Sequence, residues 1–164
     1  TQYTVEMVSN MKTGDEEMVV KSRLCVDGDR KRIEANAMGQ NMITILRSDK
    51  KVIYTLMVEQ KMYMEMPLKE QPDVLKDLKD PSVVMEDQGT ETIRNQECRK
   101  YKVTVKDQSS LIWVNAKTKL PVRCVAADGK ATIDWDNYKL GAQSTELFEV
   151  PADYKKFEMP NMSQ

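Results

Sequence analysis

The sequence has 164 residues, with Lys+Arg 25 and Asp+Glu 26, and a formal net charge of −1. This length predicts a single domain over residues 1–164, large enough to bury a core without a metal or a disulfide. The balanced charge excludes the broad basic surface of a nucleic-acid-binding protein. The chain contains no His, which excludes His-based catalytic triads and His-ligated zinc.

Alternation of apolar and polar residues with a period of two dominates the chain and predicts β-strands. The predicted strands cover residues 3–7, 18–26, 30–37, 41–47, 51–58, 61–67, 97–106, 110–115, 120–126 and 130–138. Short connections such as the turn at Asp27-Gly28-Asp29 join antiparallel neighbours, because a parallel crossover needs a dozen or more residues. The sequence therefore predicts a mainly β protein built on a single, strongly curved or half-closed antiparallel sheet.

The strand pattern is interrupted between residues 71 and 82. A Pro at the start of this interval suits the first turn of a helix, and Pro81 ends one. Between them Val74, Leu75 and Leu78 form a narrow apolar stripe. We therefore expect one short amphipathic helix laid against the sheet, and one or two short lid helices in all.

Three of the chain's 12 methionines alternate along one predicted strand, at Met62, Met64 and Met66. Tyr63 and Glu65 take the opposite face, so the three thioethers share one face of the strand. Three interpretations remain open at this point. The methionines fill a core, form the deformable wall of a cavity for an apolar ligand, or hold Cu(I), which favours soft thioether sulfurs.

Three apolar side chains from other strands complete the predicted ligand site. Tyr54 and Leu56 lie on one face of their strand, together with Val52, because their spacing is two. Trp113 stands in a predicted strand further along the chain. If the interior is a cavity, we expect Tyr54, Leu56 and Trp113 to line it with the three methionines.

The three cysteines, Cys25, Cys98 and Cys124, make an odd number, so at least one thiol is unpaired or pairs between chains. None belongs to a C-x-x-C motif, so zinc and thioredoxin-like chemistry have no support. A Cys98–Cys124 disulfide remains an alternative, although the two residues are expected to be diagonal across the sheet. Cys25 and Cys98 fall on the polar side of their strands, and we expect both to be partly exposed and reactive.

No catalytic or cofactor motif is present in the sequence. It lacks the G-x-S-x-G, Walker A and dinucleotide-binding patterns. Carboxylates in turns, such as Asp134 and Asp136, lack the fuller pattern of a calcium loop. We therefore expect a protein that is not an enzyme and has no cofactor.

Three segments, taken in chain order, carry a resemblance to a known family. They are the strand pair Asn41–Tyr54, the Trp-bearing strand and Leu-Pro-Val-Arg sequence of Leu111–Arg123, and the closing Phe-x-x-Pro sequence of Phe148–Tyr154. Their order resembles the LolA/LolB-like lipoprotein-carrier superfamily, in its branch of uncharacterised exported bacterial proteins. The similarity spans roughly residues 3–157.

The resemblance implies a half-open antiparallel barrel whose apolar concave face is covered by helices. It also implies a periplasmic binding or carrier protein, with its signal peptide removed and in peripheral contact with the outer membrane. Its ligand would be a lipid or the acyl chain of a lipoprotein. Two alternatives stay open: a structural or protein-interaction module with a filled interior, and a Met-based copper-binding protein.

Overall fold

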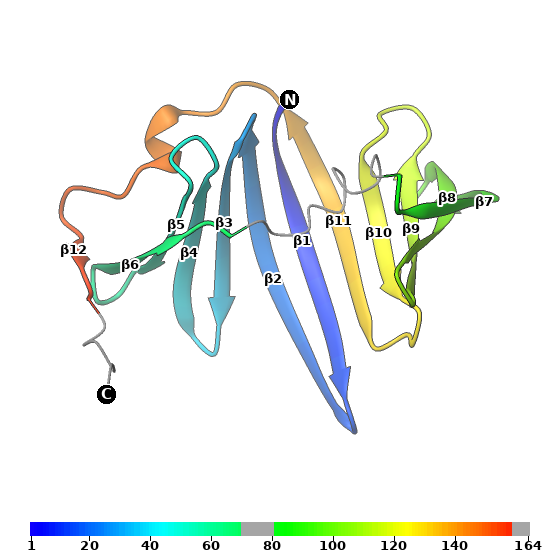
Figure 1. Ribbon diagram of the computed structural model, residues 1–164, viewed down its shortest axis with the longest axis horizontal. Coiled ribbons are helices and arrows are strands. Elements are labelled where there is room, and N and C mark those ends of the chain that lie inside the picture. The colour runs from blue at the N-terminus through cyan, green and yellow to red at the C-terminus, as the bar shows by residue number, and fades with distance from the viewer. Residues whose placement is uncertain (70–80, 159–164) are drawn as a thin grey trace. The chain divides into compact units, whose positions relative to one another are not determined.

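The computed structural model describes residues 1–69 and 81–158, and most of them lie in β-strands (Figure 1). The strands are β1 Gln2–Thr13, β2 Glu16–Asp27, β3 Arg30–Ala37, β4 Gln40–Arg47, β5 Val52–Met57, β6 Met62–Pro67, β7 Val84–Ile93, β8 Gln96–Val105, β9 Gln108–Asn115, β10 Pro121–Ala126, β11 Ala131–Leu140 and β12 Lys155–Lys156. A short 3-10 helix, η1 (Thr145–Phe148), lies between β11 and β12.

The twelve strands form one sheet in the order β12-β6-β5-β4-β3-β2-β1-β11-β10-β9-β8-β7. The pairs from β2 to β6 and from β7 to β11 are antiparallel, whereas the two-residue β12 runs parallel to β6. Tight turns between consecutive strands allow this antiparallel pairing. Gly28, for example, has a φ of 56°, a conformation that favours glycine. The prediction of a mainly β protein with one antiparallel sheet that does not close is confirmed.

Two strands, β7 and β12, were not predicted from the sequence. In β7 every residue except Ile93 is exposed, because this strand lies at an edge of the sheet. An exposed edge strand needs no buried apolar face, so the alternation that reveals other strands is weak here. The helix predicted between residues 71 and 82 falls almost entirely outside the described residues and stays a prediction.

The chain divides into two compact units, each with its own buried cluster. The first unit contains Thr1–Glu6, Lys21–Glu70 and Asn137–Gln164, and the second contains Met7–Val20 and Gln71–Asp136. Both contribute strands to the sheet. The expectation of a single domain over residues 1–164 stays a prediction.

The core of the first unit forms around Phe148, the last residue of η1. Cys25, Ile45, Leu56 and Phe148 are buried together, with side chains of the following segment packed against them. The core of the second unit combines Ile93, Cys98, Trp113 and Val122.

The prediction that Cys25 and Cys98 are partly exposed and reactive is wrong. Their exposed fractions are 1% and 0%, and burial raises the pKa of both thiols. Cys25 is covered by Phe148, which the strand alternation did not reveal. Near Cys98, the ammonium of Lys100 lies 5.1 Å from the centre of the Trp113 ring, so a basic neighbour covers the core here.

All three thiols are free, so the Cys98–Cys124 disulfide does not form in this structure. Cys98 lies opposite Asn115 and Cys124 lies opposite Ile112. The two cysteines are therefore offset by three residues along β9, which is too far for a disulfide.

Candidate functional site

The two faces of strands β3 to β6, in the first unit, have different surroundings. Directly opposed residues of paired antiparallel strands point to the same side of a sheet, so the register assigns each side chain to a face. We call one side the filled face, because it packs against η1; it includes Ile43, Ile45, Tyr54, Leu56 and Tyr63. We call the other side the methionine face; it includes Ile33, Met42, Leu46, Ile53, Met57, Met62, Met64 and Met66.

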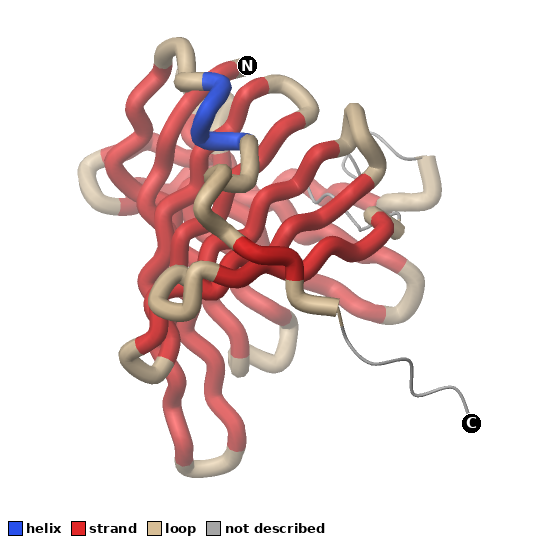
Figure 2. Tube along the Cα trace, turned by 90° about the vertical axis from the view of Figure 1, so that its left-hand side faces the viewer, coloured by secondary structure: helices blue, strands red, loops and turns tan. Residues whose placement is uncertain are grey.

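The filled face is covered by residues 145–154, which we call the C-terminal strap (Figure 2). Phe148 is the strap residue that packs against the sheet, and its exposed fraction is 0%. Leu147, Val150 and Tyr154 pack around the same cluster as partly buried side chains. The filled face therefore has its apolar partner within the chain.

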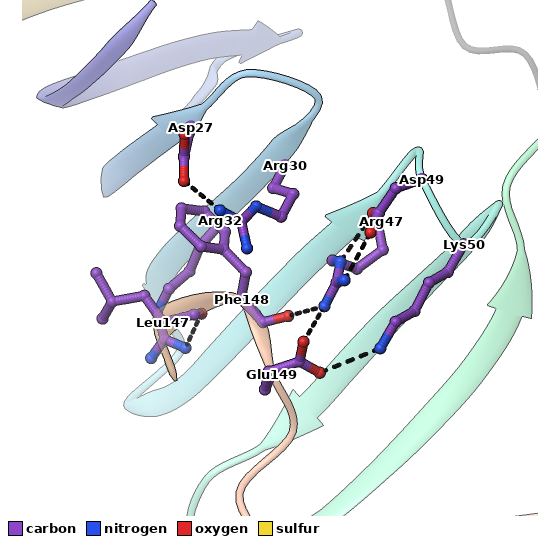
Figure 3. A network of polar contacts seen from close by, with 9 residues as sticks. All are labelled: Asp27, Arg30, Arg32, Arg47, Asp49, Lys50, Leu147, Phe148 and Glu149. Carbon is purple, nitrogen blue, oxygen red and sulfur yellow. Dashed lines mark hydrogen bonds and ion pairs between the residues drawn. The ribbon is translucent and has the colours of Figure 1, made fainter. Parts of the chain in front are cut away.

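Arg47 fastens the strap to β4 through its guanidinium group (Figure 3). Its Nη1 donates a hydrogen bond of 3.0 Å to the carbonyl oxygen of Phe148 and also contacts the carboxylate of Glu149. Its Nε and Nη2 donate to the two carboxylate oxygens of Asp49 at 2.8 and 2.6 Å. Arg47 is only 5% exposed, and all its contacts are charge-assisted or to a carbonyl, which suits a buried guanidinium.

Two further arginines hold the same part of the strap. Arg32 donates a hydrogen bond of 2.9 Å to the carbonyl oxygen of Leu147. The guanidinium carbon of Arg30 lies 5.0 Å from the centre of the Phe148 ring, and the same side chain pairs with Asp27. Arg32 therefore holds the backbone of the strap, and Arg30 packs on its central side chain.

The fastener changes the ionisation of its carboxylates. Hydrogen bonds from Arg47 lower the pKa of Asp49 from 3.8 to about 2. Burial alone would raise the pKa of Glu149, but hydrogen bonds from Arg47 and Lys50 outweigh it and lower that pKa. Hydrogen bonds to Asp49 and Glu149 in turn raise the pKa of Arg47. The cluster therefore stays fully charged at neutral pH.

The C-terminal strap packs on the filled face and therefore does not cover the methionine face. Met42 and Met66 are 38% and 43% exposed, and Met57, Met62 and Met64 are half-buried. Ile53 between them is buried. The face therefore combines a buried apolar base with flexible thioether side chains that solvent or a ligand can reach.

At the edge of this face, β6 and the end of the described chain border a shallow depression of about 260 Å³. The residues that line it are Met64, Glu65, Met66, Lys156, Phe157 and Glu158. The segment is held there because the backbone N–H of Phe157 donates a hydrogen bond of 2.7 Å to the carbonyl oxygen of Tyr63. This volume lies below the range of typical small-molecule pockets, which begins at about 300 Å³.

The structure brings together only part of the predicted ligand site. Met62, Met64 and Met66 share one face, as predicted. Tyr54 and Leu56 lie on the other, because Leu56 opposes Tyr63 and Tyr54 opposes Glu65 across the β5–β6 pair. The prediction that all five line one wall is therefore wrong: Tyr54 and Leu56 pack in the core beneath the strap.

For Trp113, the predicted role as part of a cavity wall stays a prediction. It is 7% exposed and belongs to the buried cluster of the second unit. Its indole Nε1 donates a hydrogen bond of 2.9 Å to Glu91, and Lys100 lies over its ring. These contacts give Trp113 a structural role in that unit.

Sequence reasoning did not single out Met42, Met57 or Arg47. The methionine count was the one available signal for the first two, but only the pairing of β4, β5 and β6 places them beside Met62. For Arg47 the available signal was its position at the end of the mostly apolar segment Ile43–Leu46. Its partner Phe148 lies 101 residues further along the chain.

The described part of the chain holds no group of three or more His, Cys, Asp or Glu side chains placed to bind a metal ion. Within the same residues, no helix has the length and apolar character needed to cross a membrane.

The fold and the site together define a class of protein: a single open antiparallel sheet in which the C-terminal strap fills one face of β3–β6, while Met42 and Met66 are exposed on the other. An uncharacterized conserved protein from Thermus thermophilus has a similar structure, with a TM-score of 0.70, 13% identity and coverage of 96% of this chain and 90% of that chain. This likeness shows the fold.

The chain belongs to the family described as a domain of unknown function, DUF4412, whose model matches residues 6–119. No curated protein matches the chain.

Two further solved structures are similar at lower scores. One is a LolA superfamily protein from Nitrosomonas europaea, with a TM-score of 0.46, 12% identity and coverage of 90% of both chains. The other is the Mycobacterium tuberculosis lipoprotein LppX, with a TM-score of 0.49, 11% identity and coverage of 85% of this chain and 88% of that chain.

Proposed function

We propose that this chain is a non-enzymatic binding protein that holds a lipid, or the acyl chain of a lipoprotein, against the methionine face. The observation that carries the proposal is the difference between the two faces of β3–β6. The strap fills one face with Phe148, whereas the other keeps Met42 and Met66 more than a third exposed. An exposed apolar face on a folded chain is typical of a ligand or interaction site.

The chemistry of the methionine face suits a flexible apolar ligand. Methionine is unbranched and polarizable, so it adapts to chains of different length and saturation. Each buried methylene contributes about 0.8 kcal/mol, so contact with ten carbons gives about 8 kcal/mol before the costs of ordering. Without those costs this sum would correspond to roughly micromolar binding, which is therefore the upper limit of affinity for a ten-carbon contact.

As a carrier of acyl chains, the protein would reside in the periplasm and bind the outer membrane peripherally. The support comes from the three sequence segments that resemble the lipoprotein carriers. One of them, Phe148–Tyr154, forms most of the strap, and another, Asn41–Tyr54, supplies β4 and the start of β5. Two of the three resembling segments therefore form the strap and the strands that it covers.

The test is binding of a fluorescent fatty-acid probe to the wild type and to Met64→Lys, which places a charge on the methionine face between Met62 and Met66. We expect the variant to bind the probe at least about tenfold more weakly, because a charge in an apolar contact is costly to desolvate. Asn36→Lys is the matched control: it adds the same cation at an exposed position of β3 that points to the other side of the sheet. It should bind the probe as the wild type does.

A native mass spectrum of protein purified without detergent gives an independent readout, since a retained lipid adds a defined mass. Equal probe affinity of the wild type and a folded Met64→Lys variant would place the ligand elsewhere. A wild type that binds no probe would overturn the proposal.

A further inference from the structure

We infer that Met42, Met57 and Met62 form a binding site for a soft monovalent metal ion, Cu(I) or Ag(I). The register carries this inference. Met42 on β4 lies directly opposite Met57 on β5, and Met57 lies directly opposite Met62 on β6. Three thioethers therefore stand in one row across three adjacent strands and on one face.

The spacing of the row allows the three sulfur atoms to converge. Opposed residues of neighbouring antiparallel strands have Cβ atoms about 4.5–5.5 Å apart. Two of the three rotatable bonds of methionine position its sulfur, so the side chains of Met42 and Met62 can both turn toward Met57 in the middle. This arrangement across the strands differs from Met62, Met64 and Met66 along one strand, where same-face neighbours are two residues and about 6.6 Å apart.

The row is accessible to an ion, and its one charged member, Lys155 on β12, lies at its end, opposite Met62. Met42 is 38% exposed, and Met57 and Met62 are half-buried. On the other side of Met42 the row continues with Ala35 on β3 and Ser22 on β2. At this end of the row the small uncharged neighbours leave room for an ion and do not repel it, whereas at the other end the exposed Lys155 borders Met62.

The ligand set determines which metal the site selects. The chain has no His, and Cys25 is buried beneath the strap on the opposite face. The donors are therefore thioethers alone, which suit Cu(I) and the similarly soft Ag(I) rather than Zn²⁺ or other harder divalent ions.

The test is competition for Cu(I) between the purified chain and a chromophoric Cu(I) chelator under reducing conditions, repeated with Ag(I). We expect the wild type to withdraw one ion per chain. The double variant Met42→Leu/Met62→Leu should bind at least tenfold more weakly, because it keeps apolar volume but leaves a single thioether in the row. The matched control is Met64→Leu/Met66→Leu, which removes two methionines from the same face outside the row and should bind the ion as the wild type does.

The inference is overturned if the wild type does not compete with the chelator, or if the two double variants lose the ion equally. Melting temperatures show whether both variants are folded, and the single variant Met57→Leu provides a second, milder test of the row. Zn²⁺ added in excess should not displace the bound ion. Fatty-acid probe binding is measured on the same samples, so failure of the metal site and failure of the proposed acyl site are separately visible.

Discussion

The filled face and the methionine face are built from the same strands, yet they differ in what their apolar side chains contact. On the filled face, Ile45 and Leu56 are fully buried against Phe148. On the methionine face, Met42 and Met66 remain exposed. The contrast shows that apolar residues in a strand do not by themselves form a core: a core requires a second layer, and the strap provides it for the filled face.

The strap also differs from the sheet in how it is held. Strands are joined by backbone hydrogen bonds, whereas the strap is held on the sheet by side chains: the fully buried Phe148, its partly buried apolar neighbours, and arginine contacts to the strap's carbonyl groups. A few side chains therefore decide whether the filled face stays filled. This makes the comparison of the two faces testable by single substitutions.

The largest effect is expected for Phe148→Ala. Removal of a fully buried Phe typically lowers the free energy of unfolding by about 3–5 kcal/mol, and here it also detaches the centre of the strap. Met64→Ala, on the methionine face, should cost distinctly less because its side chain is only half-buried. Urea unfolding of both variants measures the difference; equal losses would show that the two faces are equally packed.

A smaller effect is expected for Arg47→Ala. The variant loses the hydrogen bonds to Phe148, Glu149 and Asp49, and hydrogen bonds to charged groups contribute about 1.5–3 kcal/mol. Because both carboxylates are partly exposed and can be solvated by water, we expect a net loss of about 2 kcal/mol. Lys50→Ala, which removes only an exposed ion pair with Glu149, should cost under about 1 kcal/mol. A loss as small for Arg47→Ala would contradict the fastening role.

Acid should weaken the same fastening. The folded-state pKa of Asp49 is about 2, below its ordinary value of 3.8, so the stability it contributes is complete above about pH 4 and is lost as pH falls toward 2. Glu149, whose pKa is also lowered, acts in the same direction. The stability difference between wild type and Arg47→Ala should therefore shrink between pH 5 and pH 2.5. A difference that stays constant over this range would show that the carboxylates do not contribute.

The smallest effect on stability is expected for Met64→Leu, which conserves apolar volume and should cost less than about 1.5 kcal/mol. Its effect should appear in binding instead, because leucine is less flexible than methionine. We expect the variant to accept a narrower range of acyl-chain lengths in competition with the fatty-acid probe. An unchanged range of chain lengths would show that methionine flexibility does not shape the site.

The sequence predicted the strands of the sheet well because alternation and turn chemistry are local. Strand Arg30–Ala37 was predicted with the bounds that the structure has, and Val52, Tyr54 and Leu56 share a face as expected. The edge strand β7 escaped prediction because it buries almost nothing. The cysteines were misjudged because their cover comes from elsewhere: Phe148 for Cys25, and the Trp113 cluster for Cys98.

By itself, then, the sequence determined that Met62, Met64 and Met66 lie on one side of a strand, since a period of two allows nothing else in a regular strand. It could not determine which residues of other strands join them, because a shift of one residue in register moves a whole set of side chains to the opposite face. Only the tertiary structure placed Met42 and Met57 beside Met62, and Tyr54 and Leu56 beneath the strap. That choice depends on strand pairing and on a contact between residues 101 positions apart, which no local pattern encodes.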